Sequence, residues 1–160
     1  EAAKLIQELG NKEYKKKSKK SLSDQLLDYL KSHIDELYNK CLNEIGYKSI
    51  LEDDVNPNPK TKQRWAFVGC GCGITWMTYR KNNKRAEEIY TAANKYRNDE
   101  ILKLLIKKLP KKDYNYLKKI GCPFEAIWYQ MQNLQCTYYH FVIEFAKEKG
   151  INMEIHSHLD

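Results

Sequence analysis

The fold is decided by residues 22–46, LSDQLLDYLKSHIDELYNKCLNEIG. Apolar side chains recur there every three or four residues, at Leu26, Leu30, Ile34, Leu37, Cys41 and Ile45. This spacing places them on one stripe of an α-helix. Ser21 or Ser23 can cap the start of such a helix, and Gly46 can end it. The segment therefore predicts one long amphipathic helix.

The middle of the chain predicts further helices. Pro59 can open a helix that ends near Asn82, because proline is favoured at the first helical position. The stretch KRAEEIYTAANKY predicts a helix over residues 84–96, with its apolar positions turned inward. Asn98 can cap a next helix over residues 99–109, because an asparagine side chain can accept a hydrogen bond from the first helical turn.

The C-terminal third predicts a short helix and then a second long one. The short helix begins at Lys111 or Lys112 and ends at Gly121. The long one covers residues 123–149, with an apolar stripe on one face. The predicted fold class is therefore all-α, an irregular bundle of about five to six helices with long helices at roughly 22–46 and 123–149.

The predicted organisation is one domain with an extension at each end. Residues 1–20 contain a short helix and a basic linker, residues 21–150 form a single helical domain, and residues 151–160 are a C-terminal tail. No long run alternates between polar and apolar residues, so no strand is predicted. The chain begins at Glu1 and not at a methionine, so we expect that an upstream targeting segment was removed.

Charge is unevenly distributed along the chain. The net charge is +7, from 28 basic and 21 acidic residues. Residues 60–98 alone hold nine basic and two acidic residues. Such a segment can meet an anionic partner, although solvated helix faces are the simpler interpretation. The candidate partner-binding residues are the basic side chains at either side of the glycine-rich stretch: Lys60, Lys62, Arg64, Arg80, Lys81, Lys84 and Arg85.

The most unusual stretch is WAFVGCGCGITW, residues 65–76. Its glycines lack the spacing and the context of a phosphate-binding loop. An apolar run of this length is also too short to span a bilayer. Two glycines four positions apart would let a second helix pack closely. We therefore expect helix packing here, with the last long helix as the neighbour, through Trp65, Gly69, Gly73, Trp76, Trp128 and Tyr138.

Metal binding and catalysis find little support in the sequence. Cys70, Cys72, Cys136 and His140 could form a zinc site, to which His156 and His158 could add ligands. On a helix, however, Cys70 and Cys72 would diverge by about 200°. The five cysteines are irregularly spaced, which favours reduced thiols over a disulfide framework. We identify no catalytic constellation and expect no metal and no cofactor.

Residues 109–139, LPKKDYNYLKKIGCPFEAIWYQMQNLQCTYY, resemble part of the PHIST domains of exported malaria-parasite proteins. The similar features are a helix with an Ile-Trp pair, Ile127 and Trp128 here, and an aromatic residue further along it, at Tyr138 or Tyr139. The resemblance implies an exported helical module, in the host cell cytoplasm or at its membrane periphery. It also implies binding to host cytoskeletal proteins or to the cytoplasmic tails of surface antigens.

These observations together predict a non-enzymatic helical module for protein–protein interaction, and the resemblance implies that it is exported and acts in host-cell remodelling. The alternative hypothesis is a nucleic-acid-binding protein that uses the basic face of residues 60–122, where aromatic residues lie between the cations. No known nucleic-acid-binding signature supports it. Anionic lipid is a further possible partner, and no transmembrane segment is predicted.

Overall fold

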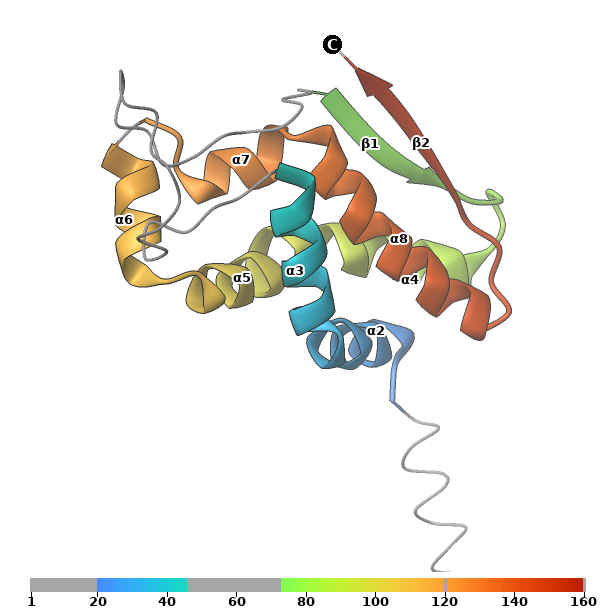
Figure 1. The fold of residues 1–160 in the computed structure, drawn as a ribbon. Helices are drawn as coiled ribbons and strands as arrows, with labels where there is room; N and C mark the ends of the chain where they lie inside the picture. Colours follow the sequence, from blue (N-terminus) through green and yellow to red (C-terminus); the bar gives the residue numbers. More distant parts are fainter. Residues whose placement is uncertain (1–19, 46–72, 120, 160) are drawn as a thin grey trace, which may run out of the picture.

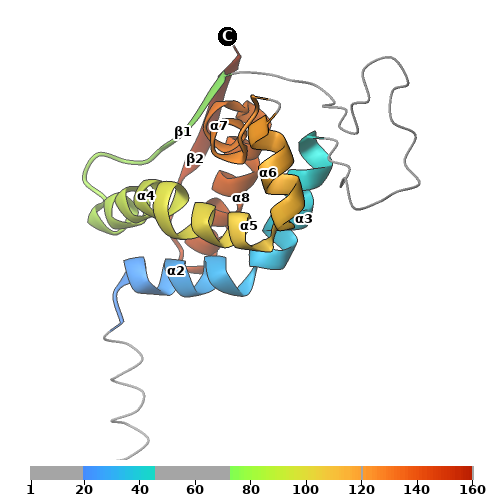
Figure 2. The same ribbon diagram turned by 90° about the vertical axis from the view of Figure 1, so that its left-hand side faces the viewer.

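A computed structural model describes residues 20–45, 73–119 and 121–159 of the chain. The described part is mostly helical, so the predicted helical bundle is confirmed (Figures 1 and 2). Its elements in chain order are α2 Leu22–Ser32, α3 Ile34–Ile45, β1 Gly73–Thr78, α4 Lys84–Tyr96, the π-helical turn η1 Arg97–Ile101, α5 Leu102–Lys108, α6 Lys111–Lys119, α7 Phe124–Gln130, α8 Gln132–Glu148 and β2 Glu154–Leu159.

Helix α8 is the centre of the core. It packs against α2, α3 and α4 as well as both strands, and more than half of its residues are buried. Trp128 of α7 and Tyr138 of α8 meet edge to face, with ring centroids 5.9 Å apart, and both are fully buried. The Tyr138 hydroxyl donates to the carbonyl of Ala93 at 2.6 Å, which ties α8 to α4.

The prediction of one long helix over residues 22–46 is wrong in one respect, because the helix is broken at His33. The Ser32 hydroxyl donates to the carbonyl of Tyr29 at 2.8 Å, and His33 Nδ1 lies 2.8 Å from the same oxygen. Side chains that bond a nearby carbonyl compete with the helical ladder. The chain turns there and α3 starts anew. The predicted stripe survives the turn, since Leu26, Leu30, Leu37 and Cys41 are all buried.

The second long helix is also broken, at Met131, which has an extended backbone with φ −80° and ψ 116°. No proline or glycine marks the place in the sequence. The break frees the carbonyls of Trp128 and Tyr129 from their usual helical partners. Two buried side chains donate hydrogen bonds to these carbonyls instead. The guanidinium of Arg97 donates to Trp128, and the amide of Gln135 donates to Tyr129. Tertiary hydrogen bonds therefore stabilise a break that local propensity does not predict.

The start and length of α4 match the prediction, and Asn83 caps it by accepting from the Ala86 N–H at 3.1 Å. The predicted cap at Asn98 is wrong. The chain passes from α4 to α5 through the wide turn η1, without a break, and the Asn98 side chain accepts from Arg97 instead. The wide turn brings Arg97 into the core, where 7% of its surface stays exposed.

The end of α6 is confirmed. Gly121 has a positive φ of 83°, and the Cys122 N–H donates to the Leu117 carbonyl at 3.0 Å. This closing bond across a left-handed residue is the usual helix ending that glycine permits.

The main difference from the prediction is an antiparallel ribbon of two strands. Strand β1 occupies residues predicted as helix, and β2 lies in the predicted tail. Their register pairs Ile74 with His158 and Trp76 with His156. The rest of the predicted helix, residues 59–72, lies outside the described residues, as do residues 1–19. The ribbon lies against α8, with β1 next to the helices and β2 at the outside (Figure 1).

Candidate interaction surface

The basic turn between β1 and α4 carries four of the predicted partner-binding residues. Arg80, Lys81, Lys84 and Arg85 are all exposed. Within residues 20–45, 73–119 and 121–159, none of the four takes part in an ion pair. We call these four residues the basic turn. The other three predicted cations, Lys60, Lys62 and Arg64, lie outside the described residues.

The outer face of the ribbon lies next to the basic turn and is unusually apolar. Ile74 is 55% exposed and Trp76 is 39% exposed, whereas Thr75 and Met77, on the opposite face of β1, are buried. Large side chains on a solvent-facing surface often mark a binding site when they lie together. Strand β2 adds His156 and His158 to the same face, opposite Trp76 and Ile74.

His156 joins the two strands on this face. Its ring stacks on Trp76, with centroids 5.8 Å apart and an interplanar angle of 25°. Its Nε2 atom lies 2.9 Å from the Thr78 hydroxyl and 3.7 Å from a carboxylate oxygen of Glu154. These contacts hold the Trp76 ring in a defined position. The sequence suggested His156 and His158 only as further zinc ligands and did not predict the strand that brings them to this face.

A hollow of about 340 Å³ connects the ribbon face to the basic turn. Its lining comes from Thr78, Tyr79 and Arg80 on one side and from Asn152 and Glu154 on the other. The Asn83 N–H donates to the Arg80 carbonyl at 2.9 Å, which closes the turn before α4. Ribbon face, hollow and basic turn are therefore continuous, and we name them together the ribbon surface.

Gln135 of α8 fixes the ribbon from beneath. Its Oε1 accepts from the Thr75 N–H at 2.8 Å, and its Nε2 donates to the Gly73 carbonyl at 3.2 Å. The same Nε2 donates to the Tyr129 carbonyl at 2.8 Å. One buried side chain thus satisfies two main-chain groups of β1 and one at the α7–α8 break. Buried polar groups need such partners, so this contact sets where β1 lies.

Arg97 and Trp128 form a second buried polar cluster. The Trp128 Nε1–H donates to the Arg97 carbonyl at 2.9 Å, and the Arg97 guanidinium donates to the Trp128 carbonyl. The guanidinium also lies 4.7 Å from the centre of the Trp128 ring. Burial lowers the pKa of Arg97 below its ordinary value, while Tyr139 and Tyr138 act in the opposite direction. The cluster has a structural role, since it links η1 to α7 inside the core.

The predicted packing residues divide into two groups. Trp128 and Tyr138 are buried in the core, where they pack on each other. Gly73 and Trp76 do not lie on a helix, so the predicted helix–helix approach is wrong for this part of the stretch. The reason is that Trp76 belongs to a strand and points to the outer face. Trp65 and Gly69 lie outside the described residues.

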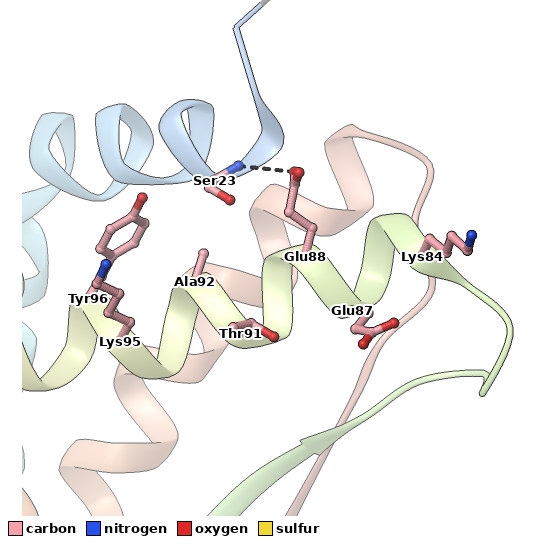
Figure 3. A pocket seen from close by; sticks show the side chains of 8 residues that line it. All are labelled: Ser23, Lys84, Glu87, Glu88, Thr91, Ala92, Lys95 and Tyr96. Atoms are coloured by element: carbon pink, nitrogen blue, oxygen red, sulfur yellow. Dashed lines mark hydrogen bonds between the residues drawn. The ribbon is translucent and has the colours of Figure 1, made fainter.

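A second hollow, of about 520 Å³, lies between α2 and α4 (Figure 3). Its lining mixes the charges of Lys84, Glu87, Glu88 and Lys95, and the Ser23 N–H donates to Glu88 at 3.2 Å across it. Its charges offset each other, and it does not favour one class of ligand.

The predicted zinc alternative gains no site in the described part of the chain. No group of three or more possible ligands gathers there. Cys136 is half-buried and interacts with Ser157, while His140 is exposed beside Lys40 and Glu44. Cys70 and Cys72 lie outside the described residues.

The described thiols should differ in reactivity. Burial raises the pKa of Cys41 to about 12, with Glu44 adding to the shift and Arg97 opposing it. A neutral, buried thiol is a poor nucleophile. We expect iodoacetamide at pH 8 to modify exposed Cys122 quickly and Cys41 only after unfolding, as measured by mass spectrometry of digested peptides. Equal labelling of both in the folded protein would contradict the burial of α3 against α8.

None of the described helices combines the length and apolarity needed to cross a bilayer. Comparison of the chain with protein-family models, curated proteins and solved structures gave no match. Function must therefore be inferred from the residues of the chain itself.

Proposed function

We propose that this protein is a non-enzymatic interaction module that binds an acidic segment of a partner protein at the ribbon surface. The observation that carries the proposal is the basic turn, four exposed cations that follow β1 in the chain, together with the exposed Ile74 and Trp76 on that strand. A surface that joins an aromatic anchor to exposed cations without ion pairs fits an acidic segment with apolar residues between its carboxylates.

The electrostatics of α4 strengthen the attraction for an anion. Lys84 and Arg85 lie in the first turn of the helix, where the helix dipole is positive. Cations at this end are unfavourable for the helix, and a carboxylate brought by a partner relieves that cost. Glu87 is the acidic residue of this turn, so the local charge stays positive.

The aromatic part of the surface supports a protein partner. Tryptophan and arginine are enriched among the residues that contribute most to protein–protein binding. Trp76 is held by His156 and therefore loses little side-chain freedom when a partner covers it. Pre-ordering of this kind increases affinity without adding a new contact.

A nucleic-acid partner has less support. In the described part of residues 60–122, cations lie at both ends of the bundle. The basic turn is at one end, and α6 with Lys111, Lys112, Lys118 and Lys119 is at the other (Figure 1). Tyr79 and Tyr90 pack on each other, with centroids 5.4 Å apart, and do not stand free for base stacking.

The PHIST resemblance of residues 109–139 suggests a class of partner. If this chain is an exported module of that kind, its acidic segment belongs to a host cytoskeletal protein or to the cytoplasmic tail of a surface antigen. The same proposal would place the protein in the host cell, in its cytoplasm or at its membrane periphery.

Reversal of charge on α4 should weaken binding. We expect Lys84→Glu with Arg85→Glu to raise the dissociation constant for a glutamate- and leucine-containing peptide by about tenfold. The physical reason is that two cations, which attract the carboxylates of the peptide, are replaced by two anions, which repel them. Isothermal titration calorimetry at constant ionic strength measures the effect.

The matched control is Lys111→Glu with Lys112→Glu. These lysines also lie in the first turn of an exposed helix, so the change in net charge and in helix dipole is the same. This control should bind the peptide like the unchanged protein. Equal weakening by both pairs would show a nonspecific charge effect and refute the site. Tighter binding to a single-stranded oligonucleotide than to the peptide would favour the nucleic-acid alternative.

A further inference from the structure

The directions in which the main-chain N–H and C=O groups of β1 point show which edge of the ribbon is open. The N–H of Thr75 and the carbonyl of Gly73 point to Gln135, away from β2. In an antiparallel pair, residues that point away from the partner strand alternate with residues that bond to it. Thr75 is opposite Ser157, so this is a pair without main-chain hydrogen bonds between its members.

The main-chain groups of Ser157, and of Ile155 two positions before it, must then point away from β1. They lie along the outer edge of β2, and no other described element covers that edge (Figure 1). Unpaired N–H and C=O groups on an exposed edge strand are a template for another strand. The edge of β1 differs, because Gln135 caps it.

We propose that the edge of β2 pairs with β2 of a second copy of this chain, giving a symmetric dimer with a four-stranded antiparallel sheet. The two-fold axis passes beside His156. Ile155 of each copy then lies opposite Ser157 of the other, which gives four main-chain hydrogen bonds. Such a pairing is isologous, because the same edge serves both copies.

The side chains of β2 select this register. With the axis at His156, Glu154 of each copy lies opposite His158 of the other, on the outer face. A histidine can donate a hydrogen bond to a carboxylate, and a protonated histidine adds an ionic attraction. A shift of the axis to Ser157 would place histidine opposite histidine twice. An axis at Ile155 would also place Glu154 opposite a histidine, but it pairs only residues 154–156 of each strand, whereas the axis at His156 pairs residues 154–158.

The dimer also extends an existing stack. The rings of Trp76 and His156 already stack. The two-fold axis would therefore align four rings, Trp76 and His156 of each copy, across the four strands. A ribbon of two strands is marginally stable by itself, and sheets of three or more strands are favoured. The inner faces of both ribbons stay on α8 of their own copy.

This dimer goes beyond the proposed function and does not depend on it. Pairing uses the edge of β2 with the side chains of Glu154 and His158, and it leaves Trp76 and the basic turn of each copy open. A dimer would present two surfaces for acidic segments, which increases the avidity for a partner with two such segments. Peptide binding by a monomer would support the proposed function and refute the dimer, so the two can fail separately.

Sedimentation equilibrium of the full chain tests the dimer, with Ser157→Pro as the decisive variant. Proline removes the Ser157 N–H, which points to the open edge and not to β1, so the ribbon of the monomer should remain. We expect the dimer to dissociate about tenfold to a hundredfold more readily. Ser157→Ala is the matched control, because it removes the hydroxyl bonded to Thr75 but keeps the N–H.

A charge exchange tests the register. His158→Glu puts carboxylates opposite each other and should weaken the dimer about tenfold. Adding Glu154→His to that variant restores an unlike pair and should restore the dimer. A monomeric unchanged protein over the whole concentration range would overturn the proposal. So would a dimer that neither Ser157→Pro nor His158→Glu weakens, because it would use another surface.

Discussion

Replacing Trp128 with alanine should lower the free energy of unfolding by about 3–5 kcal/mol. Trp128 is completely buried, packs on Tyr138, and donates to the Arg97 carbonyl at 2.9 Å. Its removal leaves a large cavity and also leaves the Arg97 guanidinium without the ring beneath it. Urea unfolding followed by circular dichroism measures the loss.

Trp76→Ala is the matched control for Trp128→Ala. The same side chain is deleted from the outer ribbon face, where it is 39% exposed, so we expect a loss of about 1 kcal/mol or less. The exposed tryptophan should matter for peptide binding and the buried one for stability. Similar losses of stability from the two substitutions would contradict the assignment of Trp76 to the surface and of Trp128 to the core.

Gln135→Ala should have the next largest effect, with a loss of about 2–4 kcal/mol in the free energy of unfolding. The change leaves the Thr75 N–H and the Gly73 and Tyr129 carbonyls without the amide that bonds them. Two of these groups belong to β1, so the ribbon should loosen before the helices unfold. Hydrogen exchange of the Thr75 amide should therefore become faster than that of amides in α8.

The control for Gln135→Ala is Gln130→Ala, at an exposed position near the end of α7. It removes the same side chain from a position that makes no hydrogen bond to β1 or β2 in the described part of the chain, and the Thr75 amide should keep its protection. If Gln135→Ala also leaves that amide protected, the ribbon is held by something other than Gln135.

Helices with continuous local patterns were predictable from the sequence. The bounds of α4 and the glycine ending of α6 follow from apolar spacing and from cap residues close by in the chain. The buried stripe on α2 and α3 was also predictable, because burial follows the apolar positions. The break at His33 was not, because its cause is competition by two polar side chains that are common in helices.

The break at Met131 depends on partners far away in the sequence. Arg97 is 31 residues from the Trp128 carbonyl that it bonds, and local propensity carries no information about that contact. The wide turn η1, which brings Arg97 inward, has no local signal either. Such tertiary hydrogen bonds override the helical pattern of residues 123–149.

The ribbon was missed because both faces of β1 carry apolar side chains. Ile74 and Trp76 on the outer face hide the alternation that the buried inner face would otherwise show. The spacing of Trp76 with residues before it then fits a helix. The pairing of Thr75 with Ser157 joins positions 82 residues apart, which a local pattern cannot predict.

The candidate site was predicted in part. The exposed cations of the basic turn were selected from charge alone, and the structure adds that they follow the strand on which Trp76 is exposed. The register of β2 places His156 and His158 on the ribbon face, whereas the sequence suggested them only as further zinc ligands. Neither their partners nor their face could be derived without the strand pairing.

A two-dimensional amide NMR titration tests most directly whether the ribbon surface binds an acidic protein segment. The protein is titrated with the glutamate- and leucine-containing peptide and, separately, with a lysine-substituted version of that peptide. We expect the amide chemical shifts of residues 74–85 and of His156 to change with the acidic peptide alone. No shifts there, or equal shifts around Lys111 and Lys112 of α6, would contradict it.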